Sequence, residues 1–125
     1  MDRPKLLIAD DNHFNLSPLV EYFEEFYDVI IANSGQTAVA LAQKEKPFAI
    51  LMDVQMPQMT GLQATILLKS DPATKNIPII IVTAFSYVGD EHTIREIGAD
   101  HFIPKPVDLD EMHTLLEKYA HGILH

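Results

Sequence analysis

Five polar residues that can do chemistry follow short apolar runs of the sequence, each at the point where a run ends. They are Asp10, Asp11, Asp53, Thr83 and Lys105. If the runs are parallel strands, their carboxyl ends meet at one edge of a sheet, where α/β proteins bind their ligands. A single Asp in such a place is often only a turn or capping residue. Five together indicate a binding or catalytic site.

Three of these residues are carboxylates, and they would repel one another strongly. Two carboxylates about 5 Å apart repel by roughly 3 kcal/mol at an effective dielectric constant of 20. Three such pairs approach about 10 kcal/mol, comparable to the whole stability of a domain, about 5–15 kcal/mol. One ammonium cannot neutralise this, so either a proton is retained or a cation binds. Oxygen ligands with no His or Cys nearby suit a hard cation, and a partly hydrated Mg²⁺ fits best.

The other two residues suit a phosphoryl group. A hydroxyl (Thr83) and an ammonium (Lys105) beside a metal can bind the equatorial oxygens of a phosphoryl group in transfer. Since no Ser, Cys or His ends an apolar run, a carboxylate would have to accept the group as an acyl phosphate. Asp53 is the candidate acceptor, because it stands alone at the central run and would face the other two carboxylates.

The apolar runs alternate with stretches of helical spacing. The runs are continuous, as in strands that are covered on both faces, and comprise Leu6–Ala9, Val29–Ala32, Phe48–Met52, Ile79–Val82 and Phe102–Ile103. The helical stretches are Leu16–Phe23, Ala38–Glu45, a third marked by Leu62 and Ile66, the weakly patterned Ser86–Glu96, and Leu109–Tyr119. This alternation predicts βαβ units, one parallel sheet and helices on both of its faces.

Single residues indicate where two of the predicted helices begin. Asp108 is well placed to cap the last helix. Pro18 leaves the start of the first helix open: the helix begins near His13 and tolerates the proline, or it begins at Ser17-Pro18.

Composition excludes several classes of protein. The chain has 125 residues, 47% of them hydrophobic, and a formal net charge of −9. This length predicts one domain with a sizeable core, and the negative charge disfavours nucleic acid as a partner. There is no apolar run of membrane-spanning length and no signal-peptide pattern. With no cysteine in the sequence, disulfides and thiolate sites are excluded, and a cytoplasmic location is expected.

Four segments, in this order and spacing, resemble the receiver domains of response regulators in two-component signalling: Leu7–Asn12, Met52–Leu62, Val82–Ala84 and Gly98–Pro106. The resemblance covers nearly the whole chain. It implies a flavodoxin-like α/β fold, with a five-stranded parallel sheet of order 2-1-3-4-5 and helices on both faces. It also implies one receiver domain over residues 1–125, without an output domain.

The same resemblance implies roles for the metal ligands. Asp53 would be phosphorylated by a phosphohistidine of a sensor histidine kinase or a histidine phosphotransfer protein. Asp11 and Asp53 would bind Mg²⁺ directly, Asp10 mainly through water, and Gln55 through its backbone carbonyl. Beyond its own phosphorylation and dephosphorylation, such a domain is not expected to be an enzyme.

It implies a switch as well. Thr83 and Lys105 would hold the phosphoryl oxygens, with Lys105-Pro106 as a cis peptide. Phe102 matches the family's switch aromatic, which is often Tyr; since Phe102 has no hydroxyl, its readout would rest on packing. A downstream protein would bind the fourth helix, the fifth strand and the last helix, and the domain would be a monomer or a switchable dimer.

Three other functions are possible for a chain with this pattern of acidic residues. An aspartate-nucleophile phosphatase of the haloacid-dehalogenase type would have a second Asp two residues after the nucleophile, where this chain has Gln55. A flavodoxin-like mononucleotide binder would have a loop rich in Ser, Thr and Gly after the first strand, where this chain has Asp10-Asp11-Asn12-His13. A receiver-like interaction module that never takes phosphate is disfavoured by the complete Asp, Thr and Lys set but stays open.

Overall fold

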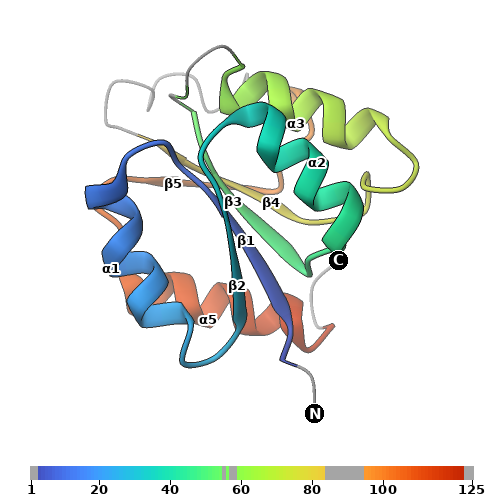
Figure 1. Cartoon of the computed structure of the whole chain (residues 1–125). Coiled ribbons are helices and arrows are strands. Elements are labelled where there is room, and N and C mark those ends of the chain that lie inside the picture. The colour runs from blue at the N-terminus through green and yellow to red at the C-terminus, as the bar shows by residue number, and fades with distance from the viewer. Residues whose placement is uncertain (1–2, 55, 57–58, 84–94, 123–125) are drawn as a thin grey trace.

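The computed structural model describes residues 3–54, 56, 59–83 and 95–122, with the backbone alone described for residues 13–16 and 83. Its strands form one parallel sheet of five, in the order β2-β1-β3-β4-β5 (Figure 1). The strands are β1 (Lys5–Ala9), β2 (Asp28–Ala32), β3 (Ala49–Asp53), β4 (Ile79–Thr83) and β5 (His101–Pro104). The predicted flavodoxin-like order 2-1-3-4-5 is therefore confirmed.

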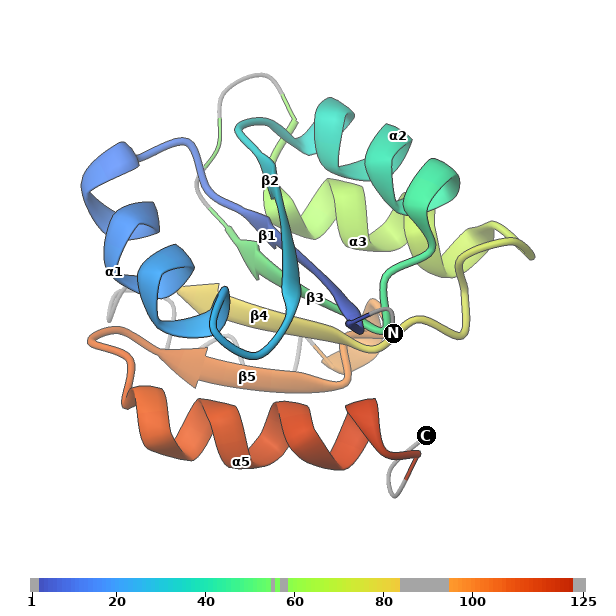
Figure 2. The same cartoon turned by 60° about the horizontal axis from the view of Figure 1, so that its bottom comes forward.

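Helices cover both faces of the sheet, as the sequence predicted. Those within the described residues are α1 (His13–Phe23), α2 (Gly35–Glu45), α3 (Gly61–Ser70) and α5 (Leu109–Ala120). In Figures 1 and 2, α2 and α3 lie on one side of the sheet and α1 and α5 on the other. The helix predicted over Ser86–Glu96 lies almost entirely outside the described residues. None of the described helices is long and apolar enough to cross a membrane.

Alternation along the central strands divides the core into two halves. In β1, Leu7 and Ala9 face α2 and α3, while Leu6 and Ile8 face α1 and α5. β4 alternates in the same way, because successive side chains of a strand point to opposite faces. Both faces being buried explains why the strands read as continuous apolar runs rather than as alternating ones.

The helix starts are fixed by side chains. Asp108 caps α5 by accepting a hydrogen bond from the amide of Glu111, as predicted. Thr60 and Gln63 form a reciprocal capping box at the start of α3. α1 begins at His13 and contains Pro18, so the earlier of the two possible starts is the observed one.

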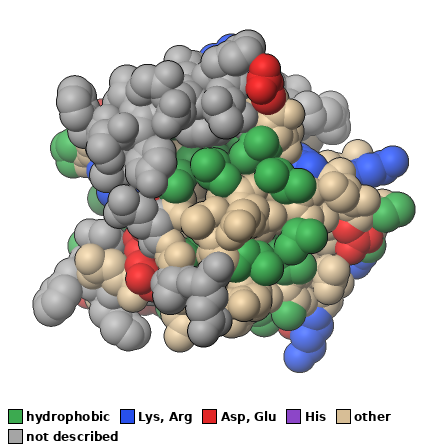
Figure 3. Space-filling model, turned by 90° about the horizontal axis from the view of Figure 1, so that it is seen from above, with side chains coloured by type: hydrophobic (Ala, Val, Ile, Leu, Met, Phe, Trp, Pro, Cys, Tyr) green, Lys and Arg blue, Asp and Glu red, His purple; other side chains and the backbone are tan. Residues whose placement is uncertain are grey.

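The third helix differs from its predicted pattern. Ile66 was expected on its apolar stripe, but Ile66 and Leu67 are 45% and 47% exposed. The buried face of α3 instead carries Gly61, Ala64, Thr65 and Leu68, and small residues also face inward from α2. The larger side chains are left on the outer surface, where Figure 3 shows hydrophobic side chains gathered on the α2–α3 side.

Candidate functional site

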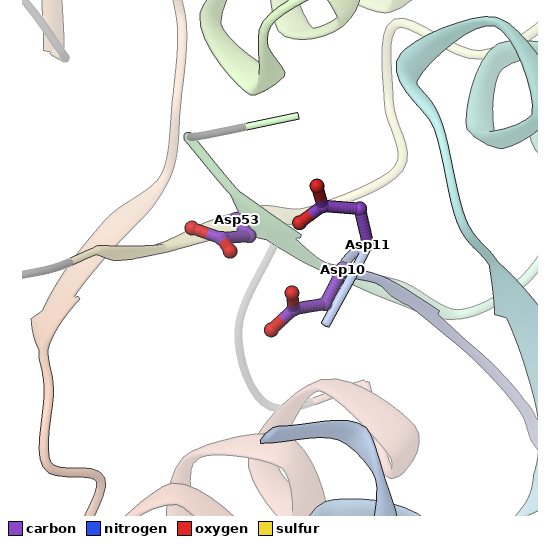
Figure 4. Close-up of side chains that lie close together, drawn as sticks. All are labelled: Asp10, Asp11 and Asp53. Carbon is purple, nitrogen blue, oxygen red and sulfur yellow. The ribbon is translucent and has the colours of Figure 1, made fainter. Parts of the chain in front are cut away.

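The three predicted carboxylates converge at the carboxyl ends of the two central strands. The register pairs Ala9 of β1 with Met52 of β3, so Asp10 and Asp53, each the next residue, are neighbours across the strands. Carboxylate oxygens of Asp10, Asp11 and Asp53 all lie within 4.8 Å of one another. Figure 4 shows the three side chains pointing into a common space. Asp10 and Asp53 are buried, at 3% and 7% exposure, whereas Asp11 is exposed.

Two hydrogen bonds, one to its backbone and one to its side chain, hold Asp10 in this position. Its amide donates to the carbonyl oxygen of Ala32 at the end of β2 (3.0 Å). One of its carboxylate oxygens accepts a hydrogen bond from the amide of Asn12 (2.9 Å), in the Asx-turn pattern. Because both its backbone and its side chain are fixed, Asp10 cannot swing away to relieve the repulsion from its neighbours.

Lys105 reaches the same cluster from beyond β5. The register pairs Thr83 with Pro104, the residue before Lys105. The Lys105 ammonium lies 3.3 Å from a carboxylate oxygen of Asp53 and 3.6 Å from one of Asp10. The Lys105-Pro106 peptide is cis, as the resemblance implied. A single cation therefore bridges two of the three carboxylates.

One lysine does not neutralise the cluster, as the ionisation of Asp53 shows. Burial, and then the negative charge of Asp10, raise the pKa of Asp53 from 3.8 to about 6, although Lys105 acts in the opposite direction. A hydrogen bond between the carboxyl groups of Asp53 and Asp10 also raises the pKa of Asp53. Without a metal, the site keeps part of a proton near neutral pH. This is one of the two outcomes that charge crowding predicts.

Gly61 fixes the backbone of Asp53, a contact that the sequence alone does not indicate. A Cβ atom on Gly61 would overlap the carbonyl oxygen of Asp53 and come within 2.9 Å of the Met52 side chain. The Gly61 amide donates to the carbonyl oxygen of Val54 (2.9 Å), and its own carbonyl accepts from the buried hydroxyl of Thr65 (2.8 Å). The first turn of α3 thus packs directly on the end of β3, and this close approach requires glycine.

The remaining predicted site residues are described only in part. Thr83 is the last residue of β4, at the same edge of the sheet, but its side chain lies outside the described residues. Gln55 also lies outside them. Phe102 is half-buried in β5 and packs against the core on the α2–α3 side. The structure thus brings Asp10, Asp11, Asp53 and Lys105 together.

The oxygen-only cluster fits a divalent cation such as Mg²⁺. Its three carboxylates come within 4.8 Å of one another, and one of them, Asp11, faces solvent. Mg²⁺ is commonly held by one or two carboxylates while it keeps several waters. Lys105 brings one positive charge to three carboxylates, so the cluster keeps a net negative charge that a dication would balance.

This fold and this site define a receiver domain. The family model of the response regulator receiver domain matches residues 6–117, and the chain belongs to that family. It is 36% identical over 115 residues to the polar-differentiation response regulator DivK of Brucella ovis, a match that covers 91% of this chain and 94% of the relative.

Solved structures agree with this assignment. The receiver domain of a sensor histidine kinase from Pseudomonas aeruginosa is 26% identical, with a TM-score of 0.86 over 95% of this chain and 98% of that one. That structure holds a magnesium ion coordinated in its active-site cleft. The receiver domain of a histidine kinase from Syntrophus aciditrophicus is 30% identical, with a TM-score of 0.87 over 96% of this chain and 92% of that one.

The raised pKa of Asp53 predicts an unusual pH dependence of stability in the metal-free protein. The pKa of Asp53 is about 6 in the folded protein, against 3.8 for the ordinary carboxyl group. Between these two pH values the native state binds more protons than the unfolded state. The contribution of Asp53 to stability is therefore lost as the pH rises from about 4 to about 6. Relative to Asp53→Asn, the wild type should lose about 2–3 kcal/mol of unfolding free energy across this window. Urea unfolding in a chelating buffer measures this. If the unfolding free energies of the two proteins changed in parallel with pH, the pKa of Asp53 would not be raised in the folded protein.

Proposed function

We propose that this receiver domain accepts a phosphoryl group on Asp53 in an Mg²⁺-dependent reaction, and that the aspartyl phosphate switches a protein-binding surface. The observation that carries the proposal is the convergence of Asp10, Asp11 and Asp53, with Lys105 in contact with the acceptor. The repulsion among the three carboxylates favours the binding of a cation. The bound cation and Lys105 together would then attract an incoming phosphoryl group.

The donor would be a phosphohistidine of a sensor histidine kinase or a histidine phosphotransfer protein. A carboxylate oxygen of Asp53 attacks phosphorus in line with the leaving nitrogen, so the O–P bond forms as the P–N bond breaks. The imidazole leaves with the electron pair of that bond and takes a proton from solvent. The product is an acyl phosphate on Asp53 and a free histidine on the partner.

Each residue of the site would have a role in this transfer. Asp53 is the nucleophile, and its contact with the Lys105 ammonium (3.3 Å) places a positive charge beside the position of the transferred group. Asp11, Asp53 and the backbone carbonyl of Gln55 would bind Mg²⁺ directly, with Asp10 acting mainly through water. The bound dication would balance negative charge on the phosphoryl oxygens. The hydroxyl of Thr83 would bind one of those oxygens.

The output would be a change of surface rather than a chemical product. Phosphorylation would draw Thr83 toward the phosphoryl group and let Phe102 move inward, which shifts a two-state equilibrium. Phe102 is half-buried and lies on β5, so it is placed to join the site to the outer face. The downstream partner would bind the face formed by the fourth helix, β5 and α5, either as one receiver or through a switchable dimer.

We further propose that residues 1–125 act as a single receiver domain in the cytoplasm, with no nucleic acid or membrane as a direct partner. The net charge of −9 supports the exclusion of nucleic acid. A receiver-like module that works without phosphate is the alternative. The two differ in one property, which is whether Asp53 takes a stable label.

Intact-mass spectrometry after incubation with acetyl phosphate and Mg²⁺ tests the proposal. The wild type should gain one phosphoryl group, and Asp53→Asn should gain none, because the nucleophilic oxygen is replaced by an amide. Asp28→Asn, on an exposed residue of β2, is the matched control and should label like the wild type. A label that persists in Asp53→Asn would place the acceptor elsewhere, and an unlabelled wild type would favour the phosphate-independent alternative.

Mg²⁺ should also stabilise the folded protein, because it relieves repulsion that the unfolded chain does not have. At a concentration of about 100 times its dissociation constant, the ion adds about 2.7 kcal/mol to the unfolding free energy. We expect the melting temperature to rise by several degrees in millimolar Mg²⁺ and to rise much less in Asp11→Ala. An unchanged melting temperature, or an equal rise in Asp11→Ala and wild type, would rule out the proposed ion site.

A further inference from the structure

The segment between β3 and α3 begins at the acceptor Asp53 and is fastened to the fold at both ends. The Gly61 amide closes it by donating to the carbonyl oxygen of Val54 (2.9 Å). Val54 and Met56 are 2% and 7% exposed and belong to the core on the α2–α3 side. A shift of Gly61 would therefore be transmitted to Asp53, because Gly61 packs on the backbone of Asp53 and is hydrogen-bonded to Val54.

A third contact comes from α2. A Cβ atom on Gly35, the first residue of α2, would lie 2.6 Å from the carbonyl oxygen of Met59, and 2.8 and 2.9 Å from its Cγ and Cβ atoms. Real Cβ atoms essentially never approach other atoms this closely. Only glycine lets the first turn of α2 rest directly on Met59, near the end of the β3–α3 segment.

The same end of α2 is joined to the strand end that carries Asp10. The Asp10 amide donates to the carbonyl oxygen of Ala32 (3.0 Å), and two residues lie between Ala32 and Gly35. The start of α2 is fixed in turn, because the Ser34 side chain accepts a hydrogen bond from the amide of Thr37 (3.1 Å). This short β2–α2 connection thus contacts the strand end of Asp10 through Ala32 and contacts Met59, which precedes Gly61 by two residues.

We propose that Gly35 is a positioning residue for the phosphoacceptor site. By lacking a side chain, it lets the β2–α2 connection hold Met59, two residues before Gly61, at a fixed distance from the strand end of Asp10. A larger residue must displace either Met59, and with it Gly61 on the backbone of Asp53, or α2, which is tied to Asp10 through Ala32. Either displacement changes the separation of the carboxylates and therefore the affinity for Mg²⁺. The inference rests on the proposed function of the site.

The side chain of Met59 accounts for only part of this contact. Met59 is partly buried against the core on the α2–α3 side, and it lines a shallow hollow between α2 and α3 with Gln36, Gln63, Ile66 and Leu67. Shortening it to Ala would remove the Cγ atom, but the backbone carbonyl oxygen and the Cβ atom of residue 59 would still lie 2.6 and 2.9 Å from a Cβ atom on Gly35. A side chain at position 35 must therefore displace backbone, whichever residue stands at position 59.

The test measures the Mg²⁺ dissociation constant of the full chain by calorimetry, together with the rate of labelling by acetyl phosphate at limiting and at saturating Mg²⁺. We expect Gly35→Ala to weaken Mg²⁺ binding about tenfold, the size of effect typical of residues that orient metal ligands. Labelling should slow at limiting Mg²⁺ and approach the wild-type rate at saturation. Gly35→Ala/Met59→Ala should recover little of the lost affinity, because the carbonyl oxygen and the Cβ atom of residue 59 remain in place. Gln36→Ala, on the next and exposed residue of α2, is the matched control and should bind Mg²⁺ like the wild type.

A merely structural role would lower the melting temperature of Gly35→Ala and leave its Mg²⁺ affinity unchanged, and this result would overturn the inference alone. Full recovery in the double variant would overturn it as well, because the backbone contact would still be present. If Gly35→Ala does not fold in buffer, its Mg²⁺ affinity is measured in a stabilising osmolyte, where weakened binding supports the inference and wild-type binding contradicts it. A wild type that neither binds Mg²⁺ nor takes a label would instead overturn the proposed function, and the inference with it.

Discussion

The repulsion among three carboxylates held at one edge of the sheet is the constraint around which the site is built. Asp10 and Asp53 are buried next to each other, and neither can move away, because Asn12 and Ala32 hold the first and Gly61 packs against the backbone of the second. The energy of this crowding appears in the raised pKa of Asp53. A site of this kind responds strongly to any added positive charge, whether a proton, a dication or an ammonium.

The rest of the fold keeps that arrangement in place. Parallel strands bring the acidic residues of β1 and β3 to the same edge, and the register of β4 and β5 brings Lys105 to the other side of Asp53. Small residues on the inner faces of α2 and α3 let both helices pack closely on the sheet. The energy stored in the crowded edge can therefore be released through ligand binding, since the scaffold does not relax.

Much of this could be predicted from sequence, for identifiable reasons. The strands were evident because both faces of the sheet are buried, and the acidic residues stood out because each follows an apolar run. The exposure of Ile66 was missed, because helical spacing does not tell which stripe packs inward when small residues can do so. The contacts of Gly35 and Gly61 were also out of reach, since a glycine in sequence does not reveal which backbone approaches it.

The central claim is that the crowded carboxylates retain a proton until a dication replaces it. Proton release on Mg²⁺ binding, measured by titration calorimetry in buffers of different ionisation enthalpy, tests this most directly. Near pH 6, where Asp53 is about half protonated, binding should release about half a proton, and the release should disappear in Asp53→Asn. Mg²⁺ binding without proton release at this pH, or the same release in Asp53→Asn, would contradict the account.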